Sequence, residues 1–212
     1  MKRCVIIGGA GITRYDRVSR FLREDDFCVF CDCGLRHLPF LQVRPGLIVG
    51  DFDSHEKPDT DAETIVLPRE KDDTDTFFAV KEAVRRGYDD FLLIGVIGER
   101  MDHTLANLSI LQYLDAAGKS ARIVDDWSEM RIISRGEAEV RDDCAYFSLL
   151  AVGGPATGIR IIGAKYPLED GTITGEFQYG VSNEVLPGQT ARISLREGRL
   201  LLVKVFQDEF PS

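Results

Sequence analysis

The segment FLLIGVIGERMDHTLANLSILQYLDAAG, residues 91–118, determines the predicted fold of the first half of the chain. Its apolar run over residues 91–98 is typical of a buried strand, and a polar turn follows it. Residues 102–118 then have the spacing of a helix that ends before Gly118. The predicted apolar face of this helix carries Leu105, Leu108, Leu111 and Leu114. A strand followed by a turn and a helix is typical of a parallel sheet covered by helices.

The same alternation of strands and helices extends in both directions from this segment. Apolar runs predict further strands over residues 3–9, 27–34, 46–54, 63–68, 121–126 and 130–134, and helical spacing predicts helices over 14–24 and 74–87. From about residue 136 the helical patterns end, and short alternating segments are separated by glycine-rich turns. We therefore predict an α/β N-terminal domain with a mostly parallel, Rossmann-like sheet over residues 1–135. An all-β sandwich domain over residues 136–212 is expected to follow it.

Composition narrows the class of protein. The chain has 212 residues, of which 44% are hydrophobic, and a formal net charge of −9. An acidic chain without a basic stripe is a poor candidate for nucleic-acid binding. No apolar run is long enough to span a bilayer, and the apolar run CVII (4–7) after the basic start is so short that it favours a first strand over a signal peptide. We therefore expect a cytoplasmic protein that does not bind membranes.

The five cysteines and the single tryptophan each have two interpretations. An odd number of cysteines without a signal peptide favours reduced thiols. The cluster CVFCDCG (28–34) is compatible with zinc, but it lacks the second paired set of a structural zinc site, and buried strands commonly contain cysteine. Trp127 lies between the two predicted domains and either stacks on an aromatic ligand or anchors the connection between them.

Polar and glycine-rich segments follow the predicted strands. They contain Gly8, Gly9 and Gly11 after the first strand, Asp32 and Gly34 after the second, Asp51, Asp53 and Ser54 after the third, REKDDTDT (69–76) after the fourth, and GERMDH (98–103) after the strand over 91–98. The carboxyl ends of parallel strands share one edge, where open α/β sheets bind ligands. Carboxylates gathered there repel one another unless a cation lies among them, and oxygen ligands favour magnesium or calcium over zinc. The glycine loop leaves room for backbone N–H groups to approach a phosphate, which together predicts a magnesium–nucleotide site.

Each of these features also has a purely structural alternative. The glycine loop is compatible with a tight turn, and Asp102 with an N-cap for the helix that follows it. Asp72, Asp73 and Asp75 are compatible with a solvated acidic turn, and Asp51 and Asp53 with capping of a turn. The histidines His37, His55 and His103 are more typical of structural or solvent-facing positions than of catalysis. All of these alternatives must hold together to remove the predicted site.

Three motifs in a fixed order carry a resemblance to a known family. GDFDS (50–54), KDDTDT (71–76) and GERMDHTLAN (98–107) resemble those of the thiamine pyrophosphokinases, also called thiamine diphosphokinases. YPLEDGTI (166–173) and GVSNEV (180–185) resemble the C-terminal motifs of that family. The resemblance covers nearly the whole chain. It implies a nucleotide-binding catalytic domain over 1–135 and a thiamine-binding domain over 136–212.

The resemblance also implies an activity and the roles of individual residues. The diphosphate of ATP is transferred to the hydroxyl of thiamine, giving thiamine diphosphate and AMP, in a homodimer whose active site lies at the subunit interface. Asp51, Asp53 and Asp75 are expected to bind Mg²⁺ and to be catalytic together with Arg100 and Asp102. The nucleotide site is expected to contain Asp32, Gly34, Lys71, Asp72, Thr74, Arg100 and Asp102. Ser182 and Asn183 are expected to bind thiamine.

The sequence departs from the family pattern at three positions, and two other functions are compatible with it. Cys31 and Cys33 replace the alanine and the first glycine that usually flank the aspartate at position 32, and Glu99 replaces a glycine. The first alternative function is a magnesium-dependent phosphohydrolase in which Asp51, within a D-x-D motif, is the nucleophile. The second is a non-catalytic sensor of nucleotide or thiamine. The general base is left unassigned, because carboxylates that bind a metal are usually poor bases.

Overall fold

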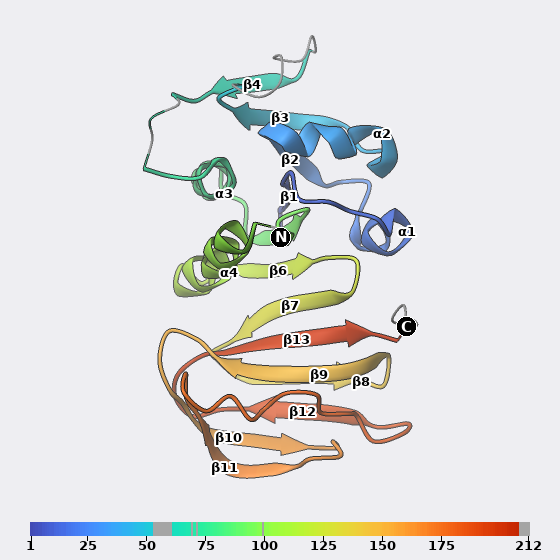
Figure 1. Ribbon diagram of the computed structural model, residues 1–212, viewed down its shortest axis with the longest axis vertical. Coiled ribbons are helices and arrows are strands. Elements are labelled where there is room, and N and C mark those ends of the chain that lie inside the picture. The colour runs from blue at the N-terminus through green and yellow to red at the C-terminus, as the bar shows by residue number, and fades with distance from the viewer. Residues whose placement is uncertain (53–60, 69, 71, 99, 208–212) are drawn as a thin grey trace. The chain divides into compact units, whose positions relative to one another are not determined.

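The computed structural model describes the chain except for residues 53–60, 69, 71, 99 and 208–212 (Figure 1). The chain forms two compact units, Met1–Asp126 and Trp127–Ser212. The domain boundary expected between residues 135 and 136 falls inside the second unit, between the strands Ser128–Ile133 (β7) and Glu137–Arg141 (β8).

The first unit is built on a parallel sheet. Its strands are β1 (Arg3–Ile7), β2 (Phe27–Cys31), β3 (Pro45–Gly50), β4 (Glu63–Val66), β5 (Asp90–Ile94) and β6 (Ser120–Val124). They lie in the order β4-β3-β2-β1-β5-β6, and each neighbouring pair is parallel, as predicted (Figure 1). All residues of the central strands β1 and β5 are buried, which is why both read as continuous apolar runs. The strand order reverses between β1 and β5, and such a switch point is where open α/β sheets bind ligands.

The helices of the first unit differ in length. They are α1 (Tyr15–Val18), α2 (Leu38–Leu41), α3 (Asp75–Arg85) and α4 (Met101–Ala116), with 3₁₀ turns over Ser19–Phe21 and Asp32–His37. The helices predicted over 74–87 and 102–118 are confirmed as α3 and α4. The helix predicted over 14–24 is wrong in extent, because the chain is already extended at Leu22. No helix of the described residues is long and apolar enough to cross a membrane.

The buried face of α4 matches the predicted leucine face only in part. Leu111 and Leu114 are buried, whereas Leu105 is 61% exposed. Thr104 and Asn107 are buried on this helix in its place. The spacing 104, 107, 111 and 114 is itself a regular helical stripe, so the first two turns turn polar rather than apolar residues inward. The prediction for Leu105 is therefore wrong, because it assumed an apolar face along the whole helix.

The second unit is a β-sandwich, as predicted. One set of antiparallel strands has the order β7-β13-β9, where β9 is Cys144–Ala151 and β13 is Leu200–Phe206. The other sheet has the order β11-β10-β12-β8, with β10 at Ala156–Ile162, β11 at Leu168–Ile173 and β12 at Thr190–Ser194. Side chains from both sets share one apolar core, which includes Phe147 and Leu202 from the first and Val140 and Ile193 from the second.

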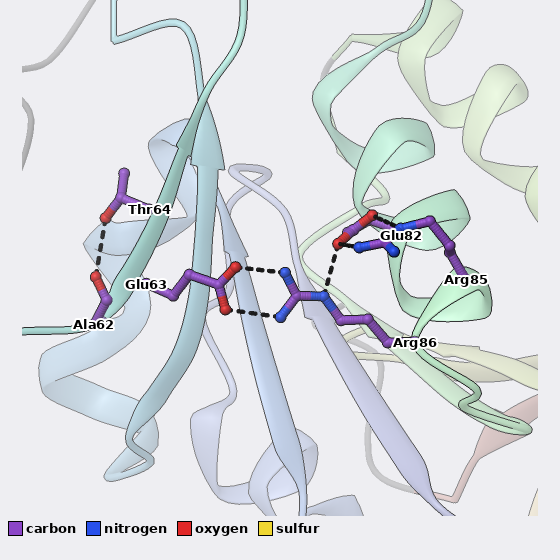
Figure 2. A network of polar contacts seen from close by, with 6 residues as sticks. All are labelled: Ala62, Glu63, Thr64, Glu82, Arg85 and Arg86. Carbon is purple, nitrogen blue, oxygen red and sulfur yellow. Dashed lines mark hydrogen bonds and ion pairs between the residues drawn. The ribbon is translucent and has the colours of Figure 1, made fainter.

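A polar network joins strand β4 to the end of α3 (Figure 2). Arg86 donates to both carboxylate oxygens of Glu63, at 2.6 and 2.8 Å, and its Nε donates to Glu82 at 2.7 Å. Arg85 binds the same Glu82 carboxylate through two bonds of 2.7 Å. The network therefore links the first residue of β4 to the C-terminal end of α3.

Candidate active site

A cavity of about 300 Å³ lies within the first unit. Its walls come from the segments that follow β1, β2 and β5 and from the first turns of α3 and α4. The cavity is therefore at the carboxyl ends of the parallel strands, where the strand order reverses. It contains charges of both signs, with Arg36 and Arg100 as cations and Asp32 and Asp75 as anions. This arrangement suits a small ligand that carries phosphates and a cation.

The glycine loop after β1 packs against the segment after β5. The Gly8 N–H donates to the Ile94 carbonyl at 2.9 Å, and the Ala10 N–H donates to the Gly95 carbonyl at 2.8 Å. A Cβ atom at Gly8 would lie 2.5 Å from the Gly95 oxygen, so only glycine fits there. These two N–H groups are occupied within the protein, and the glycines allow close packing of two loops. The expected approach of backbone N–H groups to a phosphate is therefore not seen at Gly8 and Ala10.

His37 supports the same loop from outside the sheet. Its Nε2 donates to the Ala10 carbonyl at 2.9 Å, and its Nδ1 accepts from the Tyr15 hydroxyl at 2.8 Å. Because a carbonyl can only accept, this pair of bonds fits the neutral ring with its proton on Nε2. Burial lowers the pKa of His37, which also favours the neutral ring. His37 is thus structural, whereas His103 is exposed on the cavity wall and His55 lies outside the described residues.

Asp32 and Gly34 follow β2 as the sequence predicts, and Asp32 lines the cavity whereas Gly34 is not among its lining residues. Asp32 has a φ of 38°, in the left-handed region that non-glycine residues rarely adopt. Its Oδ2 accepts from the Cys33 thiol at 3.2 Å, and its buried Oδ1 has no hydrogen-bond partner among the described residues. A Cβ atom at Gly34 would lie 2.3 Å from the Ile7 oxygen, so glycine is required there. A buried carboxylate oxygen of this kind is suited to a donor or cation that a ligand brings.

Two of the three predicted metal ligands lie in the described part of the chain. Asp51 is half-buried directly after β3, and Gly50 before it packs on Asp32, because a Cβ atom there would lie 3.1 Å from the Asp32 Cβ. Asp75 is the first residue of α3 and lines the cavity, and its carbonyl accepts from the Cys31 thiol at 3.8 Å. Asp53 lies outside the described residues. Within the described ranges, no three carboxylate, histidine or cysteine side chains form a metal-binding group.

The acidic segment before α3 places its residues differently. The Thr74 hydroxyl caps α3 by accepting from the Phe77 N–H at 3.2 Å, and Thr74 also lines the cavity. Asp72 is exposed, and Asp73 forms an ion pair with Lys81 of α3. Lys71 lies outside the described residues. Asp73 therefore pairs with a side chain of the helix, in line with the structural alternative. Thr74 and Asp75 lie at the cavity.

Arg100 and Asp102 stand together at the start of α4. The Arg100 guanidinium donates to both oxygens of the Asp102 carboxylate, at 2.9 and 2.6 Å, and Arg100 lines the cavity. The hydrogen bond from Arg100 lowers the pKa of Asp102, so this carboxylate stays ionised. Arg100 occupies the N-cap position and Asp102 lies within the first turn, so the interpretation of Asp102 as the N-cap is wrong.

The structure adds cavity residues that the sequence reasoning did not select. Arg36 lines the cavity, and its Nε donates to the Cys33 carbonyl at 3.1 Å. Thr104 and Asn107 line it from α4. The signal for these two was the helical stripe that they form with Leu111 and Leu114. No comparable sequence signal marks Arg36.

Ser182 and Asn183 lie in the second unit and differ in their surroundings. Asn183 is buried, and its amide bonds both the N–H and the carbonyl of Tyr166, at 3.0 and 2.8 Å. Ser182 is exposed with a φ of 56°, and its N–H donates to Ser148 at 3.0 Å. Exposed apolar side chains in this unit include Tyr146, Tyr166, Phe177, Tyr179 and Val181. Asn183 therefore fastens a loop, and Ser182 is the one of the two that is presented to solvent.

The structure describes the surroundings of the cysteines and of the tryptophan. All five cysteines are free, and burial raises the pKa of the Cys28 thiol to about 12. Within the described ranges no metal-binding group includes them, and Cys28 and Cys31 belong to β2 as core residues. Trp127 begins the second unit, where its carbonyl accepts from the Phe206 N–H at 2.9 Å.

Family models match most of the chain. The model described as "Thiamin pyrophosphokinase, catalytic domain" matches residues 18–124, and the one described as "Thiamin pyrophosphokinase, vitamin B1 binding domain" matches residues 132–200. A curated relative, thiamine pyrophosphokinase of Bacillus subtilis strain 168, is 24% identical over 96% of this chain and 99% of its own length.

Solved structures are similar over nearly the whole length. The thiamin pyrophosphokinase of Geobacillus thermodenitrificans matches with a TM-score of 0.82 and 28% identity, covering 97% of this chain and 98% of that one. The thiamine pyrophosphokinase of Bacillus subtilis has a TM-score of 0.86 at 22% identity, covering 98% and 100%. That of Candida albicans has a TM-score of 0.77 at 13% identity, covering 97% and 89%, and at such identities the likeness shows the fold.

Proposed function

Because this chain belongs to the thiamin pyrophosphokinase family, we propose that the cavity in its first unit binds ATP beside a magnesium ion. The chain is an enzyme that transfers the diphosphate of ATP to thiamine and gives thiamine diphosphate. Enzymes of this family need a divalent cation. The observation that carries the proposal is the cavity itself, which combines arginines and carboxylates at the switch point of the sheet.

For the cation we propose Asp51, Asp53 and Asp75 as ligands. Asp51 follows β3 and Asp75 opens α3 at the same edge of the sheet, and the donor set consists of carboxylate oxygens, which magnesium prefers. The buried Oδ1 of Asp32, which has no hydrogen-bond partner among the described residues, adds negative charge beside them. A bound cation would neutralise charge on the phosphates and among these carboxylates.

For the nucleotide we propose contacts from Arg100 and from the segment after β2. Arg100 is exposed at the cavity and carries donors in a planar fork that suits phosphate oxygens. The guanidinium also binds the Asp102 carboxylate through two hydrogen bonds. The nucleotide residues expected besides them are Asp32, Gly34, Lys71, Asp72 and Thr74. Of these, Asp32 and Thr74 line the cavity, which supports their assignment.

For thiamine we propose the surface of the second unit that includes Ser182. Exposed aromatic side chains in this unit, among them Tyr166 and Tyr179, suit an aromatic heterocycle. Asn183 acts there by holding the Tyr166 backbone. We further propose a homodimer with the active site at the subunit interface and a cytoplasmic location, with which the free thiols agree.

The transfer itself requires positioning more than covalent chemistry by the protein. The thiamine hydroxyl oxygen attacks the β-phosphorus of ATP, and the bond from that phosphorus to the oxygen of the α-phosphate breaks. AMP leaves, and the hydroxyl proton is lost to a base. Arg100 stabilises negative charge on the phosphates.

One assay tests the function and separates it from its alternatives. The protein is incubated with ATP, magnesium and thiamine, and AMP and thiamine diphosphate are measured. Both products are expected in equal amounts and only with thiamine present. Release of phosphate without thiamine would favour a phosphohydrolase that uses Asp51, and binding of ATP or thiamine without turnover would favour a sensor.

A further inference from the structure

Two polar side chains in the first two turns of α4 point inward, and the proposed chemistry does not use them. Thr104 and Asn107 are 8% and 6% exposed, and both line the cavity. Buried polar side chains are normally retained only where they are hydrogen-bonded. Both bond the backbone that connects β5 to α4, which places Arg100.

Thr104 forms hydrogen bonds with the connection at two of its residues, Gly98 and Arg100. Its hydroxyl accepts from the Gly98 N–H at 3.1 Å and donates to the Gly98 carbonyl at 3.2 Å. Its own N–H donates to the Arg100 carbonyl at 2.9 Å. The hydroxyl therefore fixes the backbone of Gly98, two residues before Arg100, and the bond to the Arg100 carbonyl is the ordinary backbone bond of the first helical turn.

Asn107 and the glycine loop hold the start of the same connection. The Asn107 Nδ2 donates to the Val96 carbonyl at 2.8 Å. From the opposite side, Gly98 packs on Ala10 so closely that a Cβ atom at Gly98 would lie 2.8 Å from the Ala10 Cβ. The connection is thus held between α4 and the loop after β1.

The Arg100 side chain depends on this backbone for its position. It is 72% exposed, and the hydrogen bonds given above for its guanidinium go to Asp102 in the same first turn. An exposed ion pair of this kind contributes little rigidity of its own. The place of the guanidinium at the cavity is therefore set by where the backbone of residue 100 lies.

We propose that Thr104 and Asn107 are positioning residues, which hold Val96, Gly98 and the backbone of Arg100 so that the arginine reaches the phosphates of ATP. The inference rests on the proposed role of Arg100. A displacement of about 1 Å in a positioned group can reduce turnover by about 10²-fold, so small shifts of this backbone affect the rate.

The first test uses a matched pair of substitutions at residue 104. Thr104→Val keeps the shape of the side chain and removes the hydroxyl, and we expect kcat to fall by about 10- to 100-fold. Thr104→Ser keeps the hydroxyl, and we expect it to retain kcat within about threefold of the wild type. Thermal unfolding of each variant shows that the fold is kept. Equal kcat in Thr104→Val and the wild type would overturn the proposal.

The second test asks whether Thr104 acts through Arg100. Thr104→Val is combined with Arg100→Gln, and we expect little further loss of kcat beyond the loss in Arg100→Gln alone, because coupled residues are not additive. Equal losses in both backgrounds would overturn positioning and leave the role of Arg100 intact. Full activity of Arg100→Gln would overturn the role of Arg100 and the inference with it.

Residue 107 and a control on the same helix complete the experiment. Asn107→Leu removes the donor to Val96, and its effect on kcat is also expected to vanish in the Arg100→Gln background. Ser109→Ala is the control, because the Ser109 hydroxyl is exposed and donates within the helix to the Ala106 carbonyl at 2.6 Å. Its kcat should equal that of the wild type. Equal loss in Ser109→Ala and Thr104→Val would show a general effect of α4 and overturn the proposal.

Discussion

Helices α3 and α4 both begin at the cavity, yet they are attached to the first unit in different ways. α3 starts with a side-chain cap from Thr74 and buries Ala79, Val80 and Ala83. α4 has no side-chain cap at its N-cap position, and its buried face begins with Thr104 and Asn107. One helix is therefore capped and packed, and the other is hydrogen-bonded to the connection that leads into it.

The difference follows from what each helix carries. α3 brings Asp75 to the cavity on its own first turn, so capping and packing of the helix fix the carboxylate. α4 brings Arg100, which precedes the helix and needs its backbone placed. Apolar contacts are not directional, whereas hydrogen bonds define both distance and direction. Polar side chains on the inner face of α4 thus serve the connection at the cost of apolar burial.

Asp75→Asn tests the proposed role of α3 and should have the largest effect. The substitution keeps the size of the side chain and removes its charge, so one proposed metal ligand is weakened. We expect turnover to fall by on the order of 10³-fold, comparable to removal of a strong electrostatic contact in other enzymes. The measurement is kcat with ATP and thiamine over a range of magnesium concentrations, and high magnesium should restore part of the activity.

Asp73→Asn is the control for this prediction, because Asp73 precedes the same helix and pairs with Lys81 but does not line the cavity. Loss of this ion pair should lower the unfolding free energy by at most about 1 kcal/mol. Its magnesium dependence should remain that of the wild type. If Asp75→Asn also kept that dependence and its turnover, Asp75 would not be a metal ligand.

A pair of leucine substitutions tests which face of α4 is buried. Leu114 is fully buried, and Leu114→Ala should lower the unfolding free energy by about 2 to 5 kcal/mol. Leu105 is 61% exposed, and Leu105→Ala should change it by less than about 0.5 kcal/mol. Urea unfolding of both variants measures the difference. Similar losses in the two variants would mean that Leu105 is buried, as the leucine spacing predicts.

The leucine pair also shows where sequence reasoning succeeded and where it did not. The parallel sheet, the sandwich and the helices α3 and α4 follow from hydrophobic periodicity, because apolar burial dominates those elements. The buried face of α4 was predicted correctly at Leu111 and Leu114 and wrongly at Leu105, because four leucines outweighed a stripe that starts with Thr104 and Asn107. Hydrogen bonds to a particular loop leave no mark on hydrophobicity, so periodicity alone does not reveal them.

The site shows the same limit. The segments that carry Asp32, Thr74, Asp75 and Arg100 were placed at the sheet edge because they follow strands, and the family resemblance supplied the expected roles of these four residues. All four line the cavity. The glycine loop suggested phosphate binding, but the N–H groups of Gly8 and Ala10 bond the segment after β5. Loop-to-loop packing depends on contacts between distant segments, which local sequence does not encode. Arg36 was missed for a similar reason, since a single arginine has no pattern.

The C-terminal ends of α3 and α4 also differ, and the smallest expected effect is a pH-dependent change in stability at the end of α3. α4 has no basic residue in its last turn, whereas Arg85 and Arg86 at the end of α3 bind Glu82 (Figure 2). Hydrogen bonds from Arg85, and then from Arg86, lower the pKa of Glu82 to about 2 from its ordinary value of 4.5. Because the folded-state pKa is lowered, the contribution to stability is complete above pH 4.5 and is lost as the pH falls toward 2.

Glu82→Gln removes this contribution at every pH, because the amide has no charge to lose. The melting temperature of the wild type should therefore exceed that of the variant by a few degrees near neutral pH, and the two should converge as Glu82 of the wild type is protonated at acid pH. Arg86 lowers the pKa of Glu63 in both proteins, and the charge of Glu82 opposes this shift in the wild type alone. A difference in melting temperature that stayed constant from neutral to acid pH would mean that packing of the side chain, and not its charge, holds the end of α3.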